Sequence, residues 1–268
     1  MGMNTLQYST FQASDLSQSL VDQYRKDGFI QLEGVFQGDE LKLIRDSVAN
    51  AVASETVAPP DNKGAAGVYE QIFIQKVNLW RRHTAVRKFV LSKRLGNIAA
   101  RLEGVPMRVW HDQALFKEPG KVNNRTPWHQ DAPYWPHQDR WRQTTIWIAL
   151  KDATIHNGCM SFVSGTHSLG AFSAINLGDP QDIFQYAPHI KPVKPVTCEL
   201  KAGDVTFHNG LTFHYAGPNK SDQTREAFAI IYMPENTTYS GETHRVTDPL
   251  NLNVGQKLEH DMFPQVSD

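Results

Sequence analysis

Residues 107–117, MRVWHDQALFK, mark the point where the chain changes from helical to strand-like patterning. From Met107 onward, apolar and polar residues alternate, which is typical of β-strands whose successive side chains point to opposite faces. The pattern predicts short strands at Arg108–Lys117, Trp128–Asp131, Thr144–Lys151, Cys159–Val163, Val196–Leu200, Asp204–His208, Phe213–Ala216 and Ala227–Met233.

Turn signals separate these strands, and no helical pattern lies between them. The signals include Pro119-Gly120, Asn157-Gly158, Ser164-Gly165, Asn209-Gly210 and Gly217-Pro218. Short strands at this spacing predict a mainly β fold, either an antiparallel sandwich or a jelly-roll barrel. Residues 167–195 have little periodicity and are expected to cross the barrel mouth, while 235–268 has the composition of a polar, weakly patterned tail.

The N-terminal part of the chain predicts a helical layer that supports the barrel. Apolar periodicity and capping residues indicate helices at 15–26, 40–53 and 84–102, with a short strand at 29–32 and a β-like segment at 69–79. We therefore expect one catalytic domain over residues 1–268, made of a support layer (1–106), a jelly-roll core (107–234) and a C-terminal tail (235–268).

Composition and charge argue against several classes of function. The chain has 27 basic and 28 acidic residues without a long run of either sign, so neither a nucleic-acid footprint nor a polybasic membrane patch is expected. Cys159 and Cys198 provide no disulfide framework. No signal-peptide pattern or spanning apolar run is present. These features predict a soluble, cytoplasmic protein, a monomer or homodimer, that acts on a small molecule.

The segment 128–136, WHQDAPYWP, contains the most informative polar pair. His129 and Asp131 lie two residues apart, and on a β-strand such residues point to the same face, where one metal ion could contact both. The best candidate for a third ligand is His214, 85 positions after His129. Two histidines and one carboxylate on one face of a divalent ion, with the remaining positions open, form the facial triad of non-haem Fe(II) oxygenases.

Arg225 adds a second chemical requirement. It follows His214 by eleven residues, and a tight turn at Gly217-Pro218 would place it on the next strand, facing the same cavity. Its planar guanidinium suits a two-pronged contact with a carboxylate. Iron beside a buried arginine suggests 2-oxoglutarate as co-substrate, with its 1-carboxylate and 2-oxo group on the metal and its far carboxylate on Arg225.

From about Tyr24 to Pro234 the chain resembles the phytanoyl-CoA dioxygenase-like family of Fe(II)/2-oxoglutarate-dependent oxygenases. The matching segments are YRKDGF (24–29), HDQALFKEPG (111–120), WHQD (128–131), WIALKDAT (147–154), NGCM (157–160), VSGTH (163–167) and the stretch from Gly203-Asp204 to Arg225. The resemblance implies a double-stranded β-helix, which is a jelly-roll, cupin-like barrel, in agreement with the strand pattern.

The resemblance also implies roles for individual residues. The metal ligands would be His129, Asp131 and His214, and the co-substrate contacts would be Arg225, Gln113, Trp147 and Lys76. The reaction would use Fe(II), O2 and 2-oxoglutarate, release succinate and CO2, and hydroxylate or otherwise oxidise an unactivated C–H bond of a small organic molecule.

Three positions bear on how closely the chain follows the family. Many relatives have Ser where this chain has Ala216, so one hydroxyl contact with 2-oxoglutarate would be missing or replaced. The segment 164–167, SGTH, replaces the usual Pro-Gly-Ser-His, which is a conservative change. Halogenating relatives have Gly or Ala in place of the ligand carboxylate, so the retention of Asp131 favours hydroxylation or desaturation over halogenation.

Simpler interpretations of these residues are also open. An isolated His-x-Asp is more often a surface or core pair, Arg225 alone fits a surface strand, and Trp147 fits the core. His208 and His111 are interpreted as structural residues or as supports of the ligands. The alternative functions are a non-catalytic cupin-like metal-binding protein and a Zn-dependent hydrolase.

The substrate pocket is expected beside the ligands. Tyr134, Trp135 and Trp128 would shape it together with residues 58–67 and 167–190. The identity of the substrate does not follow from these residues.

Overall fold

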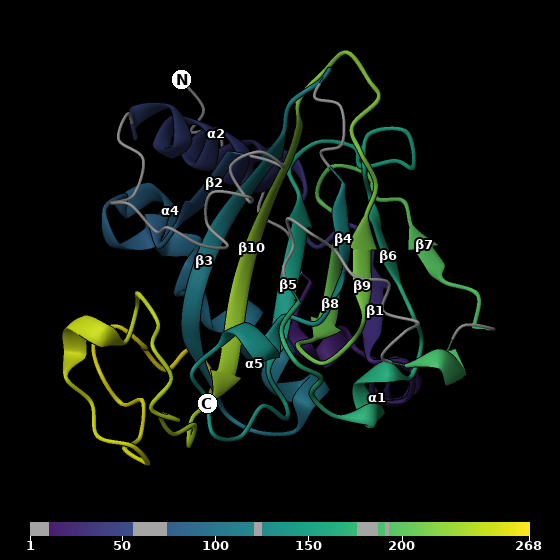
Figure 1. Ribbon diagram of the computed structural model, residues 1–268. Helices are drawn as coiled ribbons and strands as arrows, with labels where there is room; N and C mark the ends of the chain where they lie inside the picture. The colour runs from purple at the N-terminus through teal and green to yellow at the C-terminus, as the bar shows by residue number, and fades with distance from the viewer. Residues whose placement is uncertain (1–10, 56–73, 121–124, 176–186, 191–192) are drawn as a thin grey trace.

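The computed structural model describes residues 11–55, 74–120, 125–175, 187–190 and 193–268. Two antiparallel sheets face each other, in the strand orders β1-β8-β5-β10-β3-β2 and β4-β9-β6-β7 (Figure 1). The strands are β1 Phe29–Leu32, β2 Ile74–Val77, β3 Met107–Lys117, β4 Thr126–His129, β5 Thr144–Ala149, β6 Met160–Phe162, β7 Val196–Cys198, β8 Val205–Asn209, β9 His214–Ala216 and β10 Arg225–Pro234. The predicted jelly-roll architecture is confirmed.

Helices lie against the face of the large sheet that is turned away from the small sheet (Figure 1). The α-helices are α1 Gln18–Asp27, α2 Gly38–Ser54, α4 Thr84–Val90 and α5 Lys93–Glu103. The short 3-10 helices are η1 Ala13–Asp15, η2 Leu79–Arg81, η3 Ala132–Tyr134, η4 Thr166–Leu169, η5 Pro188–Ile190 and η6 Asp248–Leu250. None of the helices in the described ranges is long and apolar enough to cross a membrane.

Side-chain alternation divides the interior into two cores. Along β10, Phe228 and Ile230 pack with the helices, whereas Ala227 and Ala229 face the small sheet. The outer core is therefore filled by large side chains. The inner wall is built partly from alanines, whose small side chains leave space between the sheets.

The expected single helix over 84–102 is wrong, because the chain forms two helices there. α4 ends at Val90, and Ser92 has extended backbone angles (φ −68°, ψ 114°) before α5 begins. The turn lets both helices bury apolar residues, such as Phe89 of α4 and Ile98 of α5, in one outer core. Serine favours such a position before a helix because its side chain competes for backbone hydrogen bonds inside one.

The large sheet also takes strands from the N-terminal part of the chain. β1 pairs with β8, and β2 pairs with β3. Gly28, in the left-handed region at φ 80°, ends α1 and lets β1 start immediately after it. β2 is the described part of the predicted β-like segment; residues 69–73 lie outside the described residues.

The C-terminal segment is not simply the polar tail that its composition indicated. It packs against the lower end of the large sheet (Figure 1, yellow), where the amide of Val266 donates to the carbonyl oxygen of Met107 (3.0 Å). Phe263 stacks on Trp110 at 5.2 Å between ring centroids. A Cβ at Gly96 would overlap the Val266 carbonyl, so α5 and this segment are in direct contact. Apolar residues too widely spaced for a periodic pattern still reach the core.

A buried polar cluster joins the helical layer to the large sheet. The Tyr24 hydroxyl lies within hydrogen-bond distance of both Glu103 and Thr144 Oγ1 (2.8 Å), and the side-chain amide of Asn209 donates to Glu103 (3.0 Å). Burial raises the pKa of Glu103 to about 7, although the hydrogen bonds from Tyr24 and Asn209 lower it.

This pKa predicts how the Glu103→Gln variant should differ from the parent protein in its pH dependence. The folded-state pKa of Glu103 lies above its ordinary value of 4.5, so the stabilising contribution is complete below that value and is lost as pH rises to about 7. The amide of Gln does not titrate. Between these pH values, the melting temperature of the parent should therefore fall relative to that of the variant. The fall should be about 2–4 °C for each kcal/mol lost from the free energy of unfolding. A pH-independent difference would contradict the assignment.

Candidate metal centre

Three side chains that can bind a metal converge where β4, η3 and β9 meet. His129 is the last residue of β4, Asp131 precedes η3, and His214 is the first residue of β9. Asp131 Oδ1 lies 3.4 Å from Nε2 of His129 and 3.5 Å from Nε2 of His214. Neighbouring ligand atoms around an octahedral ion lie about 3 Å apart. The three side chains can therefore bind one ion with little movement.

Strand pairing places the two histidines side by side. His129 and His214 are directly opposite each other in the β4–β9 pair, and their ring centroids are 4.1 Å apart. Each ring is oriented through its other nitrogen: the Nδ1–H of His129 donates to the carbonyl of Pro127 (2.8 Å), and that of His214 to the carbonyl of Thr212 (2.9 Å). These bonds leave both Nε2 lone pairs free for a metal.

Asp131 reaches the site by a different route from the one that the strand argument assumed. β4 ends at His129, and Asp131 has helical backbone angles (φ −80°, ψ −46°), so the two residues do not share a strand face. The amides of Asp131 and Ala132 both donate to the carbonyl of Gly210 (2.9 Å each). A side chain at Gly210 would press on Trp135 and Ala132, so glycine permits this close approach.

The electrostatics of the cluster favour a metal-binding protonation state. Burial raises the pKa of Asp131, but the nearby imidazoles, His214 foremost, outweigh it, so this pKa lies well below its usual value. Burial, followed by the charge of His214, lowers the pKa of His129. The carboxylate is thus ionised and the His129 imidazole neutral near pH 7, as metal ligands must be.

A cavity extends from the metal ligands into the space between the sheets. It encloses about 570 Å³, counting the part that is open to solvent, and all three ligands line it. Gln113 of β3, Trp147 of β5 and Arg225 of β10 contribute to the same wall. The structure therefore brings three of the four predicted co-substrate contacts together with the metal ligands.

Arg225 is buried and has no anionic partner among the described residues. Its side chain belongs to a residue that is only 2% exposed, and its Nε and Nη1 atoms have no hydrogen-bond partner in the described part of the protein. The guanidinium lies 5.1 Å from the centre of the Trp147 ring. Burial lowers the pKa of Arg225 to about 9, which still leaves it protonated near neutrality. A buried cation with free donors favours binding of an anion here.

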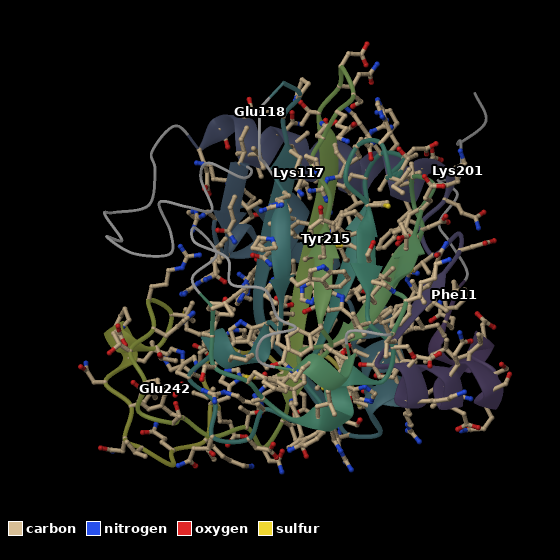
Figure 2. All side chains as sticks on the ribbon, turned by 45° about the vertical axis from the view of Figure 1, so that its right-hand side comes forward. Phe11, Lys117, Glu118, Lys201, Tyr215 and Glu242 are labelled. Carbon is tan, nitrogen blue, oxygen red and sulfur yellow. The ribbon has the colours of Figure 1, made fainter. Side chains whose placement is uncertain are left out.

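A second buried basic side chain, Lys117, lies next to Arg225. Lys117 (labelled in Figure 2) is the strand partner of Arg225. Its Nζ donates to the carbonyls of Ala216 (3.1 Å) and Gly217 (2.7 Å). Burial, and then the charge of Arg225, lowers the pKa of Lys117 well below its usual value. Lys117 thus links the large sheet to β9 at Ala216.

The structure does not bring Lys76 to the cavity. Lys76 pairs with Ala114, which packs in the outer core, so this register position faces away from the space between the sheets. Its neighbour Gln75 lines the cavity instead and donates to Gln113 (2.7 Å). Sequence reasoning missed Gln75 because the side that a residue faces depends on the β2–β3 register, and a shift of one residue reverses it.

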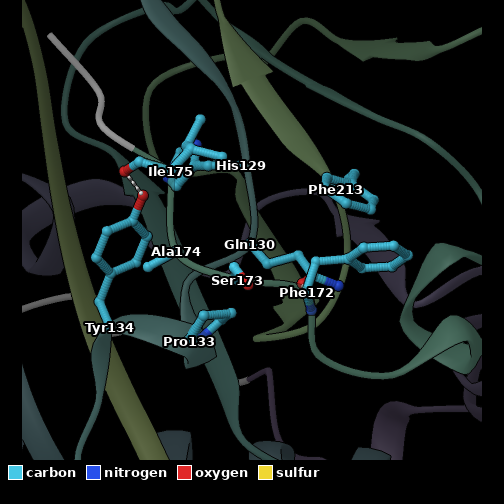
Figure 3. Close-up of a pocket in the computed structure, with 9 residues that line it drawn as sticks. All are labelled: His129, Gln130, Pro133, Tyr134, Phe172, Ser173, Ala174, Ile175 and Phe213. Atoms are coloured by element: carbon cyan, nitrogen blue, oxygen red, sulfur yellow. Dashed lines mark hydrogen bonds between the residues drawn. The ribbon is translucent and has the colours of Figure 1, made fainter. Parts of the chain in front are cut away.

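A second, smaller pocket lies on the other side of His129 (Figure 3). Tyr134 and Phe172 line it, as expected for Tyr134 and for part of 167–190. Trp128 and Trp135 are not among its lining residues: Trp128 stacks on Tyr215, and Trp135 is buried in the inner core. Residues 58–67 lie outside the described residues.

Gln130 and Tyr134 hold the segment 170–175 over this pocket. The amide group of Gln130 donates to the carbonyls of Gly170 (2.9 Å) and Leu211 (2.7 Å), and its oxygen accepts from the amide of Phe172 (2.8 Å). The Tyr134 hydroxyl donates to the carbonyl of Ile175 (2.7 Å), as the dashed line in Figure 3 shows. A residue between two metal ligands therefore anchors the pocket wall.

The other histidines do not enlarge the metal cluster. Within the described ranges, His129, Asp131 and His214 are the group of three or more such side chains with ligand atoms close enough for one ion. His111 is buried, and burial lowers its pKa to about 3. His208 contacts Asp131 through Nε2 at 3.3 Å, which agrees with its interpretation as a support of the ligands.

Comparison with known proteins gives consistent matches. A Danio rerio phytanoyl-CoA dioxygenase domain-containing protein 1 is 28% identical over 191 residues, a match that spans 68% of this chain and 65% of the relative. The crystal structure of the non-heme alpha-ketoglutarate-dependent carbocyclase SnoK from nogalamycin biosynthesis has a TM-score of 0.80 and 29% identity, and covers 96% of this chain and 98% of that one.

A further solved relative contains ligands. The epimerase SnoN, in complex with Fe3+, alpha-ketoglutarate and nogalamycin RO, has a TM-score of 0.72 and 26% identity over 93% of this chain and 98% of that one. The model of the phytanoyl-CoA dioxygenase family matches residues 24–227, which is well over half of the sequence. This chain belongs to the phytanoyl-CoA dioxygenase family.

Proposed function

We propose that this protein is an Fe(II)- and 2-oxoglutarate-dependent dioxygenase that oxidises a C–H bond of a small organic molecule. The observation that carries the proposal is a single cavity lined by both a three-ligand metal site and a buried guanidinium with unpaired donors. A metal site alone fits many functions. The combination requires a ligand with a metal-binding group and a separate carboxylate, as 2-oxoglutarate has.

The residues present fit both groups. Two imidazoles and one carboxylate leave half of an octahedral iron's positions for 2-oxoglutarate and O2. His129, Asp131 and His214 would hold the iron, and Arg225 would pair with the carboxylate of 2-oxoglutarate. Gln113 and Trp147 line the cavity in which the rest of the co-substrate would lie.

The solved relatives support the cofactor assignment more strongly than the product. SnoN was crystallised with iron and alpha-ketoglutarate, the same compound as 2-oxoglutarate. SnoN is an epimerase, whereas SnoK is a carbocyclase, so similar folds carry different reactions. Hydroxylation or desaturation, rather than halogenation, is our proposed reaction for this chain, because Asp131 retains the carboxylate that halogenating relatives lack.

The protein's contribution is positioning and charge balance. Iron and 2-oxoglutarate, when bound, supply oxidation by O2 with release of succinate and CO2. The ionised Asp131 neutralises one unit of the metal's charge, and Arg225 orients the co-substrate by its far end. Ala229 lines the cavity, and Ala227 lies in the same inner core. Residues 1–268 would act together as one catalytic domain.

The rival functions leave part of this arrangement without a role. Structural zinc sites are normally closed by four protein ligands, whereas the cluster here offers three. A zinc hydrolase would use the open position for water. Neither alternative explains a desolvated arginine with free donors in the same cavity.

Anaerobic titration separates these alternatives. Addition of Fe(II) and then 2-oxoglutarate to the metal-free protein should produce a weak visible charge-transfer band that requires both components. A zinc hydrolase or a non-catalytic metal-binding protein would produce no such band. Screening small organic compounds for stimulated succinate release would then identify the substrate class.

We predict that His129→Ala, Asp131→Ala and His214→Ala each weaken Fe(II) binding sharply and abolish succinate production, because each removes one of three ligands. Iron stoichiometry and succinate release are the measurements. His137→Ala is a suitable control, since His137 is also buried but contacts Gln143 rather than the cluster. Full activity in one of the three variants would remove that residue from the site.

Arg225→Ala is predicted to raise the 2-oxoglutarate concentration needed for half-maximal rate, because the buried carboxylate loses a charged partner. The loss should be about 2–5 kcal/mol of binding free energy, which is more than tenfold in affinity. Arg225→Lys should recover only part of it, since an ammonium group cannot make the two-pronged contact. An unchanged requirement in Arg225→Ala would place this residue outside the binding site.

A further inference from the structure

We propose that His208 is a positioning residue that holds the outer oxygen of Asp131 and keeps this carboxylate bound to the metal through one oxygen only. The inference rests on the proposed metal site and adds to it a residue that does not bind the ion.

The two oxygens of Asp131 have different surroundings. Oδ1 lies 3.4 and 3.5 Å from the ligand nitrogens of His129 and His214. Oδ2 lies 3.3 Å from Nε2 of His208 and 3.4 Å from Oγ1 of Thr145. One oxygen therefore faces the metal position, and the other faces two hydrogen-bond donors.

The large sheet places both donors. His208 of β8 and Thr145 of β5 are directly opposite each other in neighbouring strands, so their side chains project from the same face toward Asp131. His208 is 1% exposed, and its ring packs 5.3 Å from Phe162 and 4.7 Å from His214, measured between ring centroids. The imidazole has no room to turn toward solvent.

The hydrogen-bond pattern identifies His208 as a donor to the carboxylate. Its Nδ1 is buried and has no partner in the described structure, so a proton there would be left without an acceptor. The proton therefore resides on Nε2 and is donated to Oδ2, in a bond strengthened by the negative charge of Asp131. An Nε2 that carries this proton has no lone pair for a metal, which excludes His208 as a fourth ligand.

The turn after β8 adds a main-chain contact to the same aspartate. Gly210, two residues after His208, accepts the amide proton of Asp131 at 2.9 Å. The segment 208–210 thus fixes both the backbone and the outer oxygen of this ligand. If the carboxylate could rotate, both oxygens would approach the ion, and the second would occupy a position that 2-oxoglutarate or O2 needs.

Co(II) binding to the metal-free protein tests the role of His208 without a turnover assay. His208→Leu should weaken Co(II) affinity about 10–100-fold, the usual effect of losing a partner of a metal ligand. It should also change the visible Co(II) absorption, which depends on coordination number. His208→Gln, which keeps an N–H donor, should restore most of both properties. Thr145→Val removes the second donor to Oδ2. It should change the Co(II) affinity and the Co(II) spectrum in the same direction as His208→Leu, but by a smaller amount.

His137→Leu is the matched control, because His137 is 1% exposed and packs against Trp110 rather than near Asp131. It should lower the melting temperature without changing the Co(II) spectrum. Wild-type affinity and spectrum in His208→Leu would overturn the inference while leaving the metal site intact. Equal losses in His208→Gln and His208→Leu would also overturn it, since ring packing would then be the cause.

Two further outcomes are decided by the same set of proteins. If His208→Leu does not fold, the other two variants decide. A wild-type Co(II) spectrum in Thr145→Val, together with a loss of Co(II) affinity of about 10–100-fold in His208→Gln, would reject the hydrogen-bond role. If the parent protein does not bind Co(II), the proposed function fails, and this inference fails with it.

Discussion

The alternation of side chains along β5 and β10 is the constraint on which the rest of this structure depends. Ile146 and Ile148 on β5 face the helices, while Trp147 between them faces the cavity. Because the period of a strand is two residues, every outward residue that helps bind the helical layer fixes an inward residue at the proposed site. The helices therefore contribute to the site although, among the described residues, none that lines its cavity belongs to a helix.

Buried charge gives the cavity its chemical character. Asp131 is ionised among imidazoles, Arg225 lines the same cavity as a buried cation, and burial lowers the pKa of both Arg225 and its strand partner Lys117. Burial of an unpaired cation costs stability, and a dicarboxylate bound to Arg225 would recover part of that cost. Such local conflicts with the usual rules of folding are expected at functional sites.

Sequence patterns were sufficient for the architecture and for the identity of the polar groups. Turn residues and alternation predicted the sandwich, and His129, Asp131, His214 and Arg225 were all recognisable before any coordinates. Details that depend on contacts between distant segments were less accessible. The break at Ser92 and the burial of Val266 depend on partners far away in the sequence, which periodicity does not report.

The same limit explains the errors around the site. The strand argument expected His129 and Asp131 to lie close together, as they do, but its reason is wrong, because Gly210, from another part of the chain, sets the backbone of Asp131. Gln75 rather than Lys76 lines the cavity, and only the pairing of β2 with β3 decides between them. Residue types indicate which chemical groups the site contains, whereas the direction in which each side chain points depends on strand pairing.

Gln130 lies between two proposed metal ligands, and its side-chain amide is fully used in bonds to Gly170, Phe172 and Leu211. Any molecule that displaces the segment 170–175 must therefore break or stretch bonds to the metal-binding loop. Thermodynamic linkage then requires reciprocity: if occupancy of this pocket changes the affinity for the metal, metal occupancy changes the affinity for that molecule by the same factor. In such an enzyme, substrate binding at this pocket would alter the positions of the side chains that bind the metal.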